Sequence, residues 1–120
     1  MGRGYLRTVT TAEAATVSPT ARSLKLLREM GYVAQTVEYW HAPSRRRRDL
    51  FGCIDIIACH REHGILGVQA TSRVNHSTRV KKCQQSPQIL EWLLAGGALQ
   101  VWSWAKVKGR WQVKSESILP

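Results

Sequence analysis

The chain has 120 residues, 43% of them hydrophobic, which is the composition of one ordinary globular domain and not of a disordered chain. Eighteen lysines and arginines against eight acidic residues give a net charge of +10. This excess favours a polyanionic partner, with nucleic acid ahead of a membrane, although a basic but idle surface is the alternative. No apolar run approaches the roughly 20 residues that span a bilayer, so we expect no membrane contact, and we expect no small-molecule cofactor.

The chain has three cysteines, Cys53, Cys59 and Cys83. The number is odd and two of them fall in an apolar run, so we expect free thiols and a reducing, cytoplasmic setting. Cys59 stands close to His60 and His63, a grouping that suggests zinc. A structural zinc site needs four ligands and no second pair of ligands is present, so a polar hairpin turn is the favoured interpretation.

We expect an N-terminal arm over residues 1–17 and a single domain over residues 18–120. The clearest helix begins at Ser18, whose hydroxyl can cap it, and Pro19 suits the first turn. Gly31 is a natural end for this helix. The domain therefore opens with a helix.

Three strands and two turns are expected next. Residues 32–40 alternate as a strand does, and residues 41–49 follow as a loop containing four consecutive arginines. Residues 50–60 are nearly all apolar, which predicts a strand covered on both faces. The short polar stretch 61–64 predicts a tight turn, so residues 65–72 should pair with the preceding strand as a hairpin.

The remainder predicts two helices, interrupted at Pro87, and then two strands over residues 98–107 and 110–116 joined by a turn. The element order predicts an α/β fold in which a mixed sheet of four to five strands is flanked by helices.

Polar residues stand out in the two apolar runs of the predicted hairpin. Gln69 and Thr71 point to the same face of their strand, and Asp55 on the partner strand can lie beside them. A buried carboxylate is costly unless it is paired or bound to a metal ion. The structural alternatives are that Asp55 pairs with an arginine, that Gln69 bonds to a loop backbone and that Thr71 caps a helix.

The stretch "IDIIA" at residues 54–58 resembles the "PDIIA" motif of the PD-(D/E)XK nuclease superfamily, and "VQATS" at residues 68–72 stands where that family has E-x-K. Within the superfamily the chain looks most like Holliday junction resolvases and related phage or bacterial nucleases. The resemblance implies a restriction-endonuclease-like core (αβββαβ), a Mg²⁺ or Mn²⁺ cofactor, hydrolysis of DNA phosphodiester bonds, branched DNA as a substrate, and a homodimer. It also implies an intracellular protein of phage or bacterial origin.

The resemblance assigns Asp55 as a metal ligand, places Gln69 at the acidic position and puts Thr71 at the lysine position. Glutamine offers an oxygen but no charge, and threonine cannot replace a lysine. Lys81 and Lys82 are candidates for the missing lysine, and Glu38 or Asp49 for an extra carboxylate ligand. An inactive DNA-binding or architectural protein with this fold, or an RNA-binding accessory protein, is the alternative.

Basic residues flank both motifs. Arginine binds phosphate with a planar fork that stays charged, so these residues are expected to hold a nucleic acid backbone. The alternative for the arginine run is a solvated loop, and the alternative for His76 is an ordinary surface position. The candidates for nucleic acid binding are Arg45, Arg46, Arg47, Arg48, Arg73, His76 and Arg79.

Overall fold

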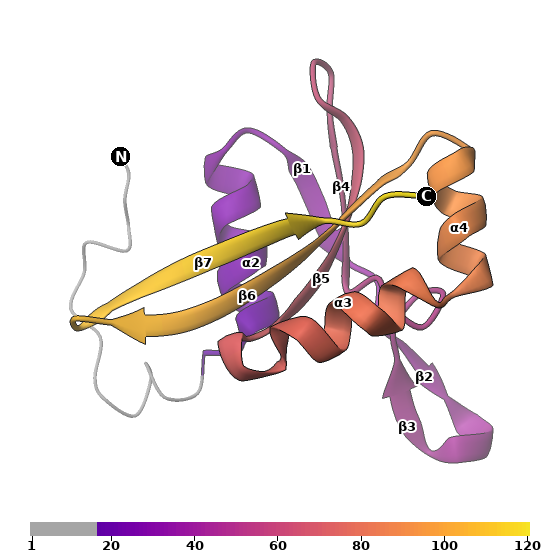
Figure 1. Ribbon diagram of the computed structural model, residues 1–120, viewed down its shortest axis with the longest axis horizontal. Helices are drawn as coiled ribbons and strands as arrows, with labels where there is room; N and C mark the ends of the chain where they lie inside the picture. The colour runs from indigo at the N-terminus through magenta and orange to yellow at the C-terminus, as the bar shows by residue number, and fades with distance from the viewer. Residues whose placement is uncertain (1–16) are drawn as a thin grey trace.

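The computed structural model describes residues 17–120, so the N-terminal arm expected over residues 1–17 lies outside the described residues except for Val17. A five-stranded sheet forms the centre and a two-stranded sheet projects from it (Figure 1). The elements are α2 (Pro19–Glu29), β1 (Val33–Thr36), β2 (Tyr39–His41), β3 (Arg46–Arg48), β4 (Ile56–His60), β5 (Gly64–Ser72), α3 (His76–Gln84), α4 (Pro87–Leu94), β6 (Ala98–Val107) and β7 (Arg110–Ser117). Short 3₁₀ turns cover Ala42–Ser44 and Arg73–Asn75.

The central sheet has the strand order β1-β4-β5-β6-β7. Its neighbours are antiparallel except for β5 and β6, which are parallel because α3 and α4 carry the chain back between them. The expected mixed α/β class, with a helix-flanked sheet of up to five strands, is confirmed. None of the helices within residues 17–120 is long and apolar enough to cross a bilayer.

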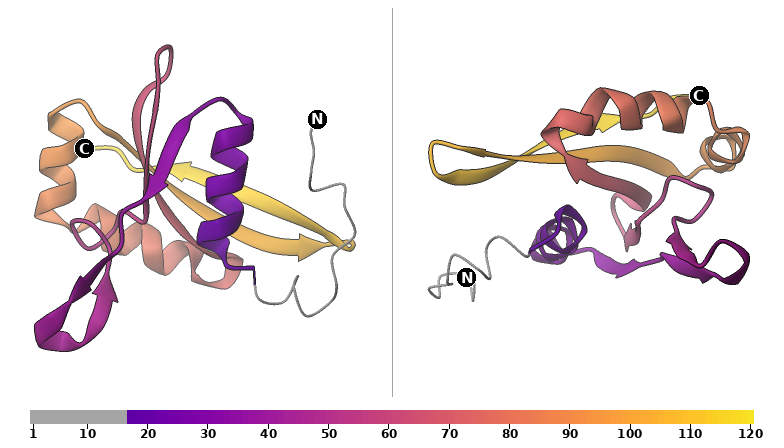
Figure 2. Two further views of the ribbon diagram at one scale, coloured as in Figure 1. Left: turned by 180° about the vertical axis from the view of Figure 1, so that it is seen from behind. Right: turned by 90° about the horizontal axis from the view of Figure 1, so that it is seen from below.

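The helices cover both faces of the sheet and make two cores (Figure 2). On one face, Leu27 of α2 packs against Ile56 and Trp102. On the other face, Val80 of α3 and Ile89 of α4 pack among residues of the sheet and of the turn before β4. Side chains that alternate along β4 and β6 therefore go to opposite cores, which explains the nearly continuous apolar runs of these strands.

The ends of α2 are as predicted. Ser18 Oγ accepts a hydrogen bond of 3.0 Å from the backbone nitrogen of Ala21. Gly31 has a φ of 94°, in the region that glycine adopts at low cost, and it ends the helix. These local signals depend only on neighbouring residues, which is why the sequence predicts them.

The prediction of a single strand over residues 32–40 is wrong, because the strand that begins at Val33 ends at Thr36. Val37 donates its backbone N–H to the carbonyl of Asp55 (2.9 Å), and beyond it the chain leaves the central sheet. Residues 39–41 instead pair with residues 46–48, which were expected to be a loop. We call residues 39–48 the arginine hairpin; it projects away from both cores (Figure 1).

The strand expected over residues 50–60 is also shorter than predicted and begins at Ile56. Leu50 and Ile54 form an isolated bridge, with the N–H of Ile54 donating to the Leu50 carbonyl at 2.8 Å. Phe51 (φ 55°) and Gly52 (φ 74°) both adopt left-handed conformations, and the N–H of Gly52 donates to the Asp49 carbonyl at 3.0 Å, so the chain turns back here. This turn brings residue 49 back beside residue 55, which decides the geometry of the site.

Candidate functional site: a carboxylate cluster beside a basic cleft

Asp55 lies buried directly before β4, on the face covered by α3. Its Oδ2 accepts hydrogen bonds from Gln69 Nε2 (2.6 Å) and from the backbone nitrogen of Ala70 (2.7 Å). The antiparallel pairing of β4 with β5 brings the two residues together, as strand alternation predicts. Thr71 is buried on the same face of β5, two residues further along the strand.

Two further carboxylates lie beside Asp55. One oxygen each from Glu38, Asp49 and Asp55 fall within 4.8 Å of one another, and we call these residues the carboxylate cluster. Burial, and next the neighbouring Asp49, raise the pKa of Asp55 to about 8, while the hydrogen bonds from Ala70 and Gln69 oppose the rise. Asp55 therefore holds a proton at neutral pH when no cation is present.

The carboxylate cluster fits a hard divalent cation. Oxygen ligands lie about 2.1 Å from Mg²⁺, so two of them stand roughly 3–4 Å apart, which small movements of the exposed Glu38 can provide. After burial, Asp49 is the next cause of the raised pKa of Asp55, and a cation bound between the two carboxyl groups would offset both effects. The donor set is all oxygen, which suits Mg²⁺ or Mn²⁺ better than zinc.

Gln69 departs from the expectation that it offers an oxygen to the metal. Its amide nitrogen, rather than its oxygen, faces Asp55 and also lies 3.4 Å from Asp49 Oδ2. The amide oxygen faces Arg79, whose Nη1 is 3.5 Å away. A cation bound at the carboxylates would repel the NH₂ group, so the amide would have to turn over before its oxygen could serve as a ligand.

Helix α3 carries two basic residues beside the carboxylate cluster and Gln69. Arg79 and Lys82 are three residues apart and share a face of the helix. Lys82 Nζ lies 3.9 Å from Asp49 Oδ2. Lys81 is exposed on the same helix and does not line the cleft described next. Of the two lysine candidates, the structure brings Lys82 to the site.

A cleft of about 1090 Å³ separates the arginine hairpin from α3 and α4, and Asp49 joins it to the carboxylate cluster. Five basic side chains line it: Arg46, Arg47, Arg48, Arg79 and Lys82. Among the described residues, Asp49 supplies the one carboxylate in this lining. The cleft is therefore strongly positive, with the carboxylates at one edge, as a site that holds a polyanion next to a cation would be.

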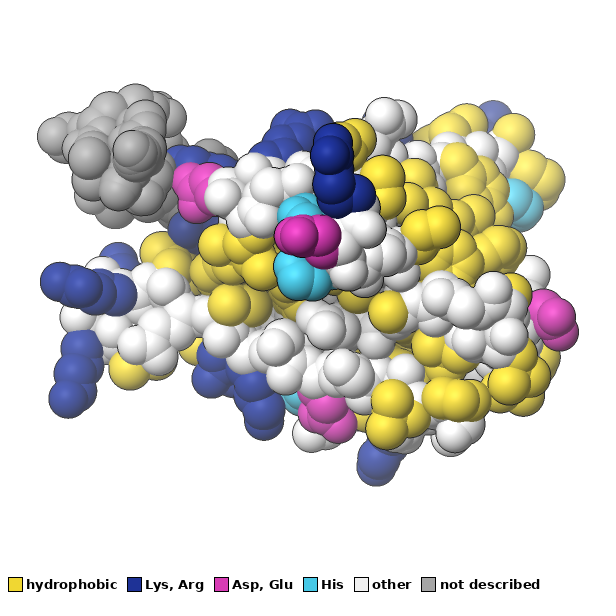
Figure 3. All heavy atoms as spheres, turned by 90° about the horizontal axis from the view of Figure 1, so that it is seen from above, with side chains coloured by type: hydrophobic (Ala, Val, Ile, Leu, Met, Phe, Trp, Pro, Cys, Tyr) yellow, Lys and Arg dark blue, Asp and Glu magenta, His cyan; other side chains and the backbone are white. Residues whose placement is uncertain are grey.

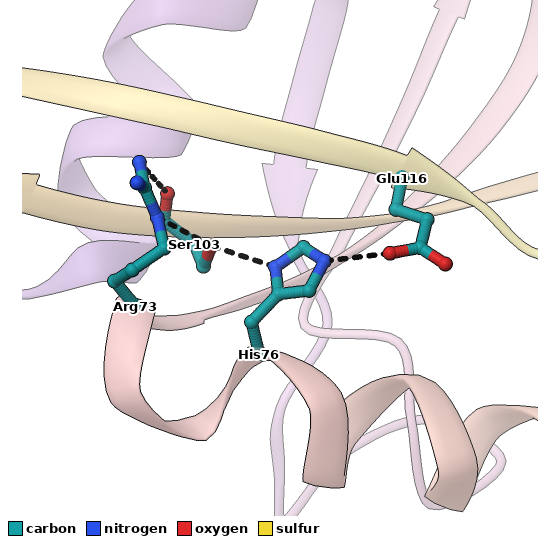
Figure 4. Close-up of polar contacts among 4 residues, drawn as sticks. All are labelled: Arg73, His76, Ser103 and Glu116. Carbon is teal, nitrogen blue, oxygen red and sulfur yellow. Dashed lines mark hydrogen bonds and ion pairs between the residues drawn. The ribbon is translucent and has the colours of Figure 1, made fainter.

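His76 does not lie in the cleft (Figure 4). It is buried, with Nδ1 2.7 Å from Ser103 Oγ and Nε2 2.9 Å from Glu116 Oε1. Arg73 Nε donates to the same Ser103 hydroxyl at 3.2 Å. The hydroxyl can then donate its own proton to His76 Nδ1, which leaves Nε2–H to donate to Glu116.

This network ties the start of α3 to β6 and β7. Ser103 is 0% exposed, so its hydroxyl cannot meet a substrate, and the histidine–serine pair serves packing rather than nucleophilic chemistry. His76 and Arg73 were expected to contact nucleic acid, but the structure uses them to position the helix that carries Arg79. The sequence signal that was missed is Ser103, a polar residue opposite Thr71 in the parallel register.

The turn between β4 and β5 gathers a second group of possible ligands. His60, Glu62 and His63 lie with ligand atoms within 4.8 Å of one another, and Figure 3 looks down on histidine and acidic side chains clustered there. The N–H of Glu62 donates to His60 Nδ1 (3.0 Å) and so occupies a lone pair that a metal would need. The rings of His60 and His63, with centroids 4.4 Å apart, pack beside Tyr32.

The structure thus gathers Asp55, Gln69 and Glu38 as the sequence predicts. Arg45, the remaining arginine of the run, is exposed at the tip of the arginine hairpin and does not line the cleft. No protein-family model, curated protein or solved structure matches this chain. The function is therefore inferred from the site itself.

Proposed function

We propose that this chain is a metal-dependent nuclease with a restriction-endonuclease-like core, which binds DNA and hydrolyses its phosphodiester bonds. The observation that carries the proposal is the carboxylate cluster at the edge of a cleft lined by five basic side chains. A polyanion in this cleft would run beside the one place in the described chain where several oxygen ligands meet next to cations. A homodimer would carry two such sites, one for each cut strand of a branched DNA.

Each group has a part that follows from its position. Asp49 and Asp55, with Glu38, would hold Mg²⁺ or Mn²⁺, and such an ion would activate water and offset charge on the phosphate. Arg79 and the arginine hairpin would hold the phosphates of the strand. Lys82, a flexible point charge beside Asp49, would hold a phosphate at the edge of the carboxylate cluster.

An inactive DNA-binding protein is the second candidate, and two observations favour it. Gln69 turns its nitrogen toward the carboxylates, and Thr71, at the position where the resembled family has lysine, is buried. Under this alternative the cleft binds DNA in the same way but no cleavage follows. Binding therefore tests what both candidates share, and cleavage separates them.

Replacing Lys82 with alanine is expected to weaken binding of DNA several-fold and to lower the slope of log affinity against log salt by about one, because one phosphate contact is lost. Lys81→Ala is the matched control, since it removes the same charge from the same helix outside the cleft. Fluorescence anisotropy over a salt series measures both variants. Equal effects of the two substitutions would mean that DNA is held by overall charge and not by the cleft.

A further inference from the structure

Two adjacent aromatic residues of the arginine hairpin point to opposite faces of its two-stranded sheet. Tyr39 pairs with Arg48, and Trp40 pairs with Arg47. Successive side chains on a strand alternate, so Tyr39 and Trp40 face opposite ways. Tyr39 lines the cleft, whereas Trp40, although 59% exposed, does not.

The Tyr39 ring is available for a ligand. Its side chain is 48% exposed, and among residues 17–120 it takes part in no ring pair. Phe51 also lines the cleft, but its ring packs against Trp92 with centroids 6.3 Å apart. Of the two aromatic residues that line the cleft, Tyr39 is therefore the one that takes part in no ring pair among the described residues.

Basic residues line the same cleft as this ring. Arg46 and Arg48 flank Tyr39 on the same sheet face, and Arg79 and Lys82 line the cleft with them. An aromatic face among cations in a groove is the arrangement that binds single-stranded nucleic acid, where the cations hold phosphates and the ring stacks on a base. Bases inside a duplex are stacked on their neighbours and do not offer a face to such a ring.

We propose that Tyr39 forms a stacking subsite for one unpaired base of the nucleic acid strand in the cleft. This inference rests on the proposed function and narrows its substrate class to DNA with an unpaired nucleotide near the cut, as at a branch, a flap or a single strand. The arginine hairpin then distinguishes an unpaired nucleotide from a paired one, while Arg79 and Lys82 bind the phosphate backbone of either.

The test compares binding of a short fluorescein-labelled single strand with that of the same sequence as a blunt duplex, using the full chain in EDTA to prevent cleavage. Tyr39→Ala is expected to weaken binding of the single strand roughly 5- to 100-fold, the loss of one stacked base, and to leave duplex binding within about twofold. Tyr39→Phe keeps the ring and should bind as the wild type does. Trp40→Ala is the matched control, an aromatic removed from the opposite face.

The outcomes separate the subsite from the proposed function. A loss confined to Tyr39→Ala and to the single strand supports the subsite. Unchanged binding by Tyr39→Ala, an equal loss for both probes, or a selective loss by Trp40→Ala instead would overturn it while leaving DNA binding intact. A wild-type protein that binds neither probe would overturn the proposed function together with the subsite. Thermal unfolding of each variant confirms that the hairpin substitution leaves the fold unchanged.

Discussion

Replacing Asp55 with asparagine is expected to lower Mg²⁺- or Mn²⁺-dependent cleavage of DNA by at least about 100-fold. Losing an outer partner of a metal site costs roughly 10–100-fold, and Asp55, buried at the centre of the carboxylate cluster, would be a direct ligand. Labelled four-way junction, duplex and single-stranded DNA, incubated with each metal, give the rates. The preferred substrate also shows whether an unpaired or branched site is required.

Asparagine is chosen because it keeps the shape of the side chain and an oxygen that can accept the hydrogen bond from Ala70. Glu62→Gln is the matched control, an acid neutralised on the β4–β5 turn outside the cleft. Cleavage by Asp55→Asn at the wild-type rate would show that the activity does not come from this site. Tight binding without cleavage by the wild type in either metal would establish the inactive alternative.

The metal-free protein is expected to lose stability as the pH rises from about 4 to about 8. The pKa of Asp55 is near 3.8 in the unfolded chain and about 8 in the folded protein, so between these values the folded state binds the extra proton. The stabilisation from that proton is complete when the pH is below the pKa of Asp55 in the unfolded chain. It is lost as the pH rises through the pKa of Asp55 in the folded protein. One pKa unit corresponds to about 1.4 kcal/mol, so the change in the free energy of unfolding is on the order of a few kcal/mol.

Asp55→Asn removes this titration and should be the more stable protein at neutral pH without metal, with a melting temperature higher by about 10 °C. At pH 3, below the unfolded pKa of 3.8, the wild-type carboxyl is mostly protonated in both states, so the two proteins should melt together. Thermal unfolding in EDTA from pH 3 to pH 8 checks both statements. A variant that is less stable than the wild type at pH 8 would mean that the ionised Asp55 is stabilised by partners in the fold.

The parts of the fold that follow from neighbouring residues are predictable, and the parts set by distant contacts are not. The cap at Ser18 and the tight turn before β5 depend on a few adjacent side chains. In the arginine hairpin, residues 39–41 pair with residues 46–48. The alternation of polar and apolar side chains up to residue 40 is equally compatible with a longer β1. The chain leaves the central sheet after Val37, whose N–H bonds to the distant Asp55 carbonyl, and this departure decides between the two.

The same distinction applies to the site. Asp55 and Gln69 could be placed together because strand alternation fixes their faces. The approach of Asp49 depends on a turn in which both Phe51 and Gly52 have a positive φ, and Gly52 alone, inside an apolar run, does not indicate that the chain folds back on itself. His76 looks like a surface residue at the start of a polar helix, and it is buried because Ser103 and Glu116, distant in sequence, supply its partners.

The central claim is that the carboxylate cluster binds a divalent cation, and isothermal titration of the metal-free protein with Mn²⁺ in two buffers of different ionisation enthalpy tests it most directly. Since Asp55 holds a proton at pH 7, binding should release about one proton, and Asp55→Asn should bind weakly and release none. Glu62→Gln should match the wild type. Binding with the same affinity and the same proton count in wild type and Asp55→Asn, or no binding at all, would contradict the account.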